Sequence, residues 1–277
     1  MQIGALCLHP VSDGTFVARL EYFGASGSPG SHPEFFSRGD AAWLPIGCFL
    51  VRTEKRLVLV DAGLGPELQR LPHGMYLVGG QLLTGLRALG VSAAEITDVI
   101  CSHLHADHVG WLFDADARPV FAGAAIWIGQ GDWHHFVAGA GEMLPHIREG
   151  FRASAVSGRV RRIDRDTTIA PGIAALLAPG HTPGHLCVVI SSGERRALLL
   201  GDAITCPIQL DEPTWHSMGD VDPLLAARTR ERMWRELEDE YTIGVGAHFP
   251  ELEFGRLRTG PVRRWCSQAG WNERKLR

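Results

Sequence analysis

The sequence lacks several features that mark particular classes of protein. Its 277 residues hold no apolar run of membrane-spanning length and no block of basic residues, and the formal net charge is −4. We therefore expect no membrane partner and no nucleic-acid partner, because a spanning helix needs about 20 apolar residues and a phosphate backbone attracts clustered Lys and Arg. A small substrate without charge fits this balance better.

Closely spaced cysteines are also missing. The six cysteines are scattered and none forms a C-x-x-C pair, which argues against a zinc ribbon, a zinc finger and a thioredoxin-like redox site. The first residues, Met1 to Leu6, do not show the charged and then apolar pattern of a secretory leader. We expect buried, reduced thiols and a cytoplasmic location.

What is present indicates an α/β protein. Hydrophobic residues make up 45% and charged residues 21% of the chain, as in ordinary globular domains. Helical patterns cover 81–89 and 222–240, and Gly-, Pro- and Ser-rich stretches at 24–40, 63–80 and 205–221 are expected to be loops over a site. No linker is visible, so we expect one domain over 1–277. Short apolar runs predict strands at 56–60, 97–101, 125–128 and 197–200.

The densest group of chemically active residues directly follows the predicted strand 97–101. There the sequence reads His103-Leu104-His105-Ala106-Asp107-His108. In an extended segment alternate side chains share a face, so His103 and His105 can bind one metal ion together. Asp107 and His108 come after the chain turns, and they can face a second ion about 3.5–4 Å away.

Three further candidate ligands follow other strand-like runs. His181 lies in a rigid loop, Pro-Gly-His-Thr-Pro-Gly-His, and Asp202 comes directly after the apolar run 198–201. A buried carboxylate without a partner is costly, and a pair of metal ions would be its partner. His248 ends a similar apolar run at 243–247.

The order H-x-H-x-D-H, then Gly-His-Thr-Pro-Gly-His, then Gly-Asp and a late His resembles the metallo-β-lactamase superfamily over nearly the whole chain. The resemblance implies an αβ/βα four-layer sandwich with the metals at one edge. It implies that Asp202 bridges both ions, that Asp61 orients ligands without binding metal, and that His185 is structural. The implied ligands are His103, His105 and His181 for the first ion, and Asp107, His108 and His248 for the second.

This site predicts a metal-dependent hydrolase. Two divalent ions that share a water lower its pKa toward neutrality, so a bridging hydroxide can act as the nucleophile. Asp107 is the candidate catalytic residue that passes a proton to the leaving group. Zinc suits histidine and carboxylate ligands, and manganese, iron or cobalt are alternatives. A relative with one iron and sulfur-dioxygenase activity stays open, although seven ligands favour two ions.

The stretch around the first motif resembles the branch that contains quorum-quenching lactonases and methyl-parathion hydrolase. The resemblance implies a small hydrophobic lactone or ester as substrate, with organophosphate triesterase activity as an addition. Lactonases of this branch often use a tyrosine shortly after the bridging aspartate, whereas this chain has Ala203-Ile204-Thr205-Cys206. Candidate walls of an apolar pocket are Phe23, Met75, Tyr76, Trp111, Phe113, Thr205 and Trp215.

Three alternatives remain at this point. A β-lactamase or a glyoxalase-type thioester hydrolase would share the leading motif, and a non-catalytic metal-binding module would share the fold. Metal content, and ester hydrolysis before and after chelation, distinguish the last from an enzyme. A homodimer is a further expectation, since Trp265 and Trp271 could pack against a second copy.

Overall fold

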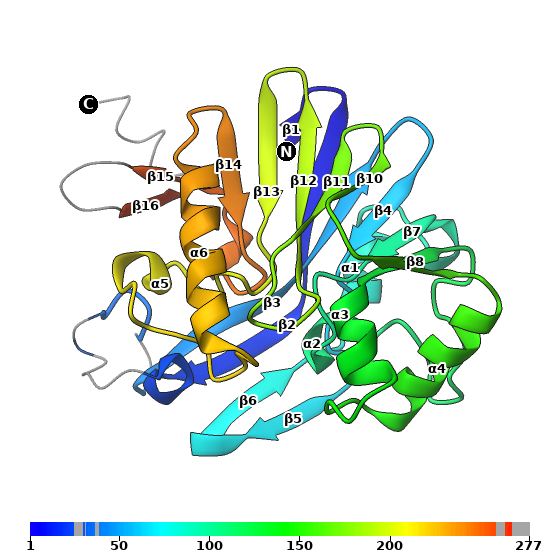
Figure 1. The fold of residues 1–277 in the computed structure, drawn as a ribbon, viewed down its shortest axis with the longest axis horizontal. Coiled ribbons are helices and arrows are strands. Elements are labelled where there is room, and N and C mark those ends of the chain that lie inside the picture. Colours follow the sequence, from blue (N-terminus) through cyan, green and yellow to red (C-terminus); the bar gives the residue numbers. More distant parts are fainter. Residues whose placement is uncertain (25–29, 31, 37–38, 259–263, 268–277) are drawn as a thin grey trace.

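A computed structural model describes residues 1–24, 30, 32–36, 39–258 and 264–267. Within this part of the chain two β-sheets face each other and helices lie on the outside (Figure 1). The expected α/β sandwich is confirmed. Apolar side chains from both sheets fill the space between them, among them Val51 and Val58 from the first sheet and Val188 and Leu198 from the second.

The first sheet has nine described strands in the order β5-β6-β2-β3-β4-β7-β8-β9, with β1 paired to β2. Pairing is antiparallel as far as β4 and parallel from β4 through β7 and β8 to β9. The carboxyl ends of the parallel strands therefore open at one edge. The strands are β1 (Gln2–Ile3), β2 (Leu6–Arg19), β3 (Ala41–Arg52), β4 (Leu57–Val60), β5 (Leu68–Leu71), β6 (Met75–Val78), β7 (Asp98–Ile100), β8 (Ala125–Gly129) and β9 (Val160–Ile163).

The second sheet runs β10-β11-β12-β13-β14-β15-β16 among the described residues. Its neighbours are antiparallel except β13 and β14, which are parallel, so the loops after these two strands leave from the same end. The strands are β10 (Thr167–Ala170), β11 (Ile173–Leu177), β12 (Leu186–Ser192), β13 (Arg195–Leu199), β14 (Thr242–Val245), β15 (Gly255–Arg258) and β16 (Arg264–Ser267).

The helices cover the outer faces, and α6 contacts β14 and β15 of the second sheet (Figure 1). Asp222 caps α6 by accepting a hydrogen bond from the Leu225 amide at 2.9 Å, as the Asp-Pro start predicts. No helix in the described part of the chain is long and apolar enough to cross a bilayer. The α-helices are α1 (Leu82–Ala88), α2 (Ala106–Val109), α3 (Gln130–Asp132), α4 (Pro145–Val156), α5 (Ile208–Asp211) and α6 (Pro223–Leu237), with short turns η1 (Leu20–Phe23), η3 (Pro72–Gly74), η4 (Ala93–Glu95), η5 (Trp133–Val137) and η6 (Pro250–Leu252).

The prediction that 63–80 is a loop is wrong for most of that range. It contains the hairpin formed by β5 and β6, which extends the first sheet beyond β2. In β6, Met75 and Leu77 are buried, while Tyr76 and Val78 face solvent. All four residues are apolar or aromatic, so the alternation that identifies a strand is hidden in the sequence.

The structure describes only one of the other two predicted loops in full. Range 205–221 is irregular apart from α5. Range 24–40 falls partly outside the described residues.

Trp265, one of the two residues expected at a dimer contact, packs edge-on against Phe249 at 5.1 Å between ring centroids. Trp271, the other, also lies outside the described residues, and the homodimer stays a prediction.

Asp13 fixes the segment that carries the hairpin. Its side chain is fully buried on β2, next to the bulge where the pairing with β3 shifts. Each carboxylate oxygen accepts several hydrogen bonds from chain segments far from it in sequence. The donors are the amides of Leu64, Gly65, Gly80, Gln81 and Leu82 and the indole of Trp111, at 2.7–3.2 Å.

Candidate metal centre

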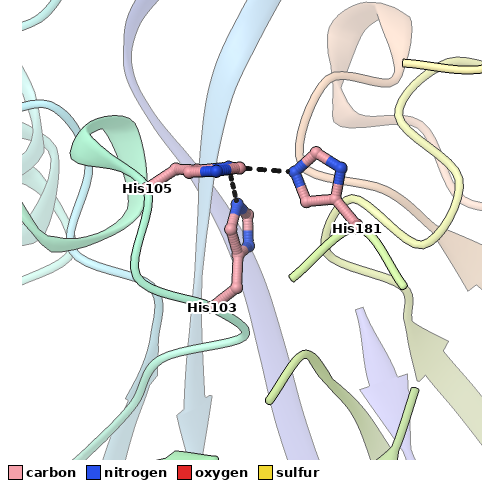
Figure 2. Close-up of side chains that lie close together, drawn as sticks. All are labelled: His103, His105 and His181. Carbon is pink, nitrogen blue, oxygen red and sulfur yellow. Dashed lines mark hydrogen bonds between the residues drawn. The ribbon is translucent and has the colours of Figure 1, made fainter. Parts of the chain in front are cut away.

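Three imidazoles form the first group of candidate ligands (Figure 2). His103 and His105 leave the loop after β7, and His181 leaves the loop between β11 and β12. The His105 Nδ1 lies 3.0 Å from the His103 Nε2 and 3.0 Å from the His181 Nε2. Nitrogens bound to one tetrahedral zinc ion are about 3.3 Å apart, so the three rings already converge on a space of the right size.

A second group lies beside the first. Asp107 and His108 are at the start of α2, and His248 follows β14. The His248 Nε2 is 3.3 Å and the His108 Nε2 3.8 Å from the same carboxylate oxygen of Asp107. One ligand atom from each residue lies within 4.8 Å of those of the other two, so this group could hold a second ion.

Asp202 stands between the two groups. It follows β13, and its carboxylate oxygens lie 3.6 Å from the His108 Nε2, 3.6 Å from the His181 Nε2 and 3.5 Å from the His248 Nε2. Gly201 before it has a φ of +53°, and a Cβ there would lie 2.7 Å from both His185 and Ser102. The tight turn therefore requires glycine, and it directs Asp202 between the groups as a bridging ligand needs.

In four of the histidines the nitrogen that faces away from the cluster has a hydrogen-bond partner of its own. Such a partner fixes the ring orientation and leaves the other nitrogen free for a metal. His105 differs, because its Nδ1 faces the cluster. The partnered contacts are His103 Nδ1 with Ser102 Oγ at 3.1 Å, His108 Nδ1 with Asp61 Oδ2 at 2.9 Å, His181 Nδ1 with Asp220 Oδ1 at 2.8 Å, and His248 Nδ1 with the Pro45 carbonyl at 2.7 Å.

Asp61 lies at the end of β4 behind His108. It accepts hydrogen bonds from the Ser102 amide at 2.6 Å and the Ser102 hydroxyl at 2.8 Å, and its side chain is almost fully buried. Its φ of +63° is unfavourable for a residue with a Cβ. Asp61 is thus held in a strained conformation at the position where it can orient His108.

The charges of the site are those of a cation-binding cluster. Burial and the neighbouring His181 lower the pKa of His105 to about 3, which leaves a neutral ring able to bind metal. Burial alone would raise the pKa of Asp107, but His108 and His248 lower it to about 2. Burial would also lower the pKa of His108, yet Asp107, Asp61 and Asp202 raise it to about 9. The buried carboxylates thus hold positive charge in the site.

Two unpartnered atoms show that the residues fit metal ions. Among the residues that the structure describes, the buried His108 Nε2 and Asp202 Oδ1 have no hydrogen-bond partner, although they face each other at 3.6 Å. Unpaired buried polar atoms cost about 1–3 kcal/mol each. A divalent cation between them would satisfy both, and the donor set of imidazoles and carboxylates suits zinc and similar ions.

His185 and Asp132 hold the loops that carry the cluster. The His185 Nε2 accepts a hydrogen bond from the Asp202 amide at 3.0 Å, which agrees with a structural role. Asp132 accepts from the Leu104 amide, the Thr182 hydroxyl and the Gly184 amide at 2.6–3.2 Å, and so joins the 103–108 loop to the 181–185 loop. Burial raises the pKa of Asp132 to about 6 although these donors oppose the shift. The sequence offers no motif that would have identified it.

Three of the predicted pocket residues lie on the His248 side of the cluster. Phe23, Met75 and Trp215 belong to one apolar group with Phe16. The Phe16 ring in turn contacts the His248 ring edge-on, with 5.4 Å between centroids. This apolar group therefore borders the candidate ligands.

Phe113, Trp111 and Tyr76, which are also predicted as pocket walls, do not belong to that group. Phe113 is buried against Phe151, and the Trp111 indole donates to Asp13. Tyr76 faces outward from β6. Thr205 is fully buried, and its hydroxyl has no hydrogen-bond partner in the described part of the chain.

Tyr22 of η1 is a site residue that the sequence did not reveal. Its ring packs edge-on against Phe16 at 4.8 Å, and its hydroxyl interacts with that of Ser217. Burial, with Asp202 as the next cause, raises the pKa of Tyr22 well above its usual value. The phenol therefore stays neutral beside the cluster and can donate a hydrogen bond. It comes from a segment far from Asp202 in sequence, so no local pattern points to it.

The model of the metallo-beta-lactamase superfamily matches residues 41–243, and the chain belongs to this superfamily. Its relatives include an N-acyl homoserine lactonase of Bacillus thuringiensis, 27% identical over 76% of this chain and 83% of the relative. A Bacillus sp. enzyme of the same name is 27% identical over 58% of this chain and 64% of its own length. The family and these relatives identify the chain as a metal-dependent hydrolase.

Solved structures agree with the fold. AidC, described as a dizinc quorum-quenching lactonase in complex with a product, superposes with a TM-score of 0.83 at 26% identity, over 97% of this chain and 96% of AidC. The hydrolase AbOPH superposes with a TM-score of 0.80 at 20% identity, over 96% of each chain. Together with the cluster above, the dizinc neighbour supports a site for two divalent ions.

Proposed function

We propose that this protein opens lactones that carry a hydrophobic acyl group, N-acyl homoserine lactones among them, at a centre of two divalent metal ions, with zinc as the first candidate. The observation that carries the proposal is the buried cluster in which Asp202 lies between two three-residue groups of candidate ligands. The ligands we assign are His103, His105 and His181 for one ion, Asp107, His108 and His248 for the other, and Asp202 for both.

The bound ions would supply an activated water and would polarise the substrate carbonyl. The chain's own residues do the rest. Asp107 keeps its carboxylate ionised at neutral pH and has more exposed side-chain surface than Asp202, so it can take up a proton and pass it to the leaving oxygen. Tyr22 offers a neutral hydroxyl on the side where Phe16 borders His248.

The apolar residues beside the cluster favour an uncharged substrate. Phe16 borders His248 and belongs to one apolar group with Phe23 and Trp215, and Phe136 contacts His105 edge-on at 5.6 Å. An acyl chain bound there would bury apolar surface away from water, which would favour binding by about 25 cal/mol per Å² buried. The relatives named N-acyl homoserine lactonases support the same class of substrate.

A panel of four substrates tests the proposal: a γ-lactone with a long acyl chain, an aryl acetate, an aryl phosphotriester and a cephalosporin, each assayed with defined metals. We expect the lactone to have the highest kcat/KM. His103→Ala should abolish its turnover, and His134→Ala, which removes an exposed histidine, should not change it. Faster turnover of the cephalosporin would favour the β-lactamase alternative, and faster turnover of the phosphotriester an organophosphate hydrolase; either result would reject the lactonase.

A further inference from the structure

A buried ion pair lies behind His181, outside the set of candidate ligands. Asp220 belongs to the segment between α5 and α6, and its carboxylate has no exposed surface. Its Oδ1 lies 2.8 Å from the His181 Nδ1, the nitrogen that faces away from His105. A carboxylate can only accept a hydrogen bond here, so the proton belongs on the Nδ1 of His181 and the Nε2 is left with a free lone pair.

Arg230 of α6 supplies the opposite charge. Its side chain is only 2% exposed, and a guanidinium nitrogen lies 3.7 Å from the Asp220 Oδ2. The guanidinium also donates to the Trp215 carbonyl at 2.7 Å. Burying an arginine without a partner is expensive, so its position indicates that it balances Asp220 and holds the segment that carries this residue.

The backbone of the same segment encloses His181. The Ser217 amide donates to the Asp220 Oδ2 at 2.9 Å, and the Val221 amide donates to the His181 carbonyl at 2.9 Å. A Cβ on Gly219 would lie only 3.0 Å from the His181 ring and 3.4 Å from the His105 ring. The segment is therefore packed against two of the three imidazoles of the first group.

We propose that Asp220, held by Arg230, is a positioning residue that fixes the ring and tautomer of His181 and thereby sets the metal affinity of the His103, His105 and His181 site. This inference rests on the proposed metal centre and goes beyond it, because neither residue is one of the ligands assigned above. Carboxylates that orient a ligating histidine typically change metal affinity by about 10–100-fold when removed.

The test measures zinc affinity of the full chain by competition with a chromophoric chelator. We expect Asp220→Ala to lower the affinity for one of the two zinc ions about 10–100-fold. Asp220→Asn should lower this affinity less, because its amide oxygen can still accept a hydrogen bond from the His181 Nδ1. Nitrogen NMR of the histidine rings in the metal-free protein should show that His181 no longer favours the Nδ1-protonated form in Asp220→Ala. Unchanged affinity or an unchanged tautomer would overturn the proposal.

A second pair of variants separates positioning from simple destabilisation. Asp220→Ala leaves Arg230 unpaired, whereas the double variant Asp220→Ala with Arg230→Met removes both charges and should recover the thermal midpoint without recovering zinc affinity. Asp222→Ala, in the same segment, is the matched control: it removes the cap of α6, so it should lower the midpoint and leave zinc affinity unchanged. Recovery of zinc affinity together with the midpoint in the double variant would show that the pair is only structural.

The outcome is independent of the lactonase proposal. Zinc affinity and histidine tautomers are measured without substrate. Failure of the wild-type chain to hydrolyse lactones would reject the proposed function while the zinc data still test Asp220.

Discussion

At the scale of single residues, the direction of each imidazole matters as much as its presence. His103, His108, His181 and His248 each direct Nε2 into the cluster, because a separate oxygen occupies Nδ1. His105 instead presents Nδ1 and has no such oxygen partner among the described residues. Its low pKa of about 3 keeps it neutral, so it can still bind metal.

Asp107→Asn tests the proton-transfer role. The amide cannot take up the proton that an ionised carboxylate accepts, so we expect kcat on a lactone to fall by about 100-fold or more and KM to change little. Metal content must be measured in the same samples, because Asp107 is also a proposed ligand. Asp116→Asn is the control, since that side chain is 67% exposed. Turnover equal to wild type with both ions bound would rule out this role.

At the scale of elements, the site depends on loops that buried carboxylates hold in place. Asp13 receives six donors from the hairpin segment and from Trp111, and Asp132 joins two of the ligand loops. Both side chains are fully buried. These residues shape the surroundings of the cluster without belonging to it.

Asp13→Ala should lower the free energy of unfolding by about 3–5 kcal/mol, because it leaves several buried backbone amides without an acceptor. Denaturant unfolding followed by circular dichroism measures this change. Asp164→Ala, at a side chain that is 62% exposed, should change the free energy by less than about 0.5 kcal/mol. A loss below about 1 kcal/mol for Asp13→Ala would mean that solvent replaces the carboxylate.

The sequence predicts the candidate ligands far better than it predicts the residues that hold those ligands in place. His103 to His108 form one contiguous motif, and His181, Asp202 and His248 each end an apolar run, so local pattern was enough to find them. The buried side chains of Asp13 and Asp132 accept from partners that are 28 or more residues away, Asp220 lies 39 residues from His181, and Tyr22 meets Ser217 from a distant segment. Only the folded chain brings such partners together.

At the scale of the whole molecule, both sheets direct functional loops toward one edge of the sandwich. The parallel strands β4 and β7 carry Asp61 and the 103–108 motif, and the parallel pair β13 and β14 carries Asp202 and His248. The two groups of candidate ligands therefore combine residues from both sheets. The Asp202 Oδ1, after β13 of the second sheet, lies 3.6 Å from the His108 Nε2, which follows β7 of the first sheet.

Counting bound metal during reactivation tests the central claim most directly. Metal-free protein would be titrated with zinc while bound zinc is measured by elemental analysis and lactone hydrolysis is followed. We expect activity to be absent without metal and to reach its full value at two zinc ions per chain. Full activity in metal-free protein, or a chain that binds no zinc, would contradict a two-metal centre built from these five histidines and two aspartates.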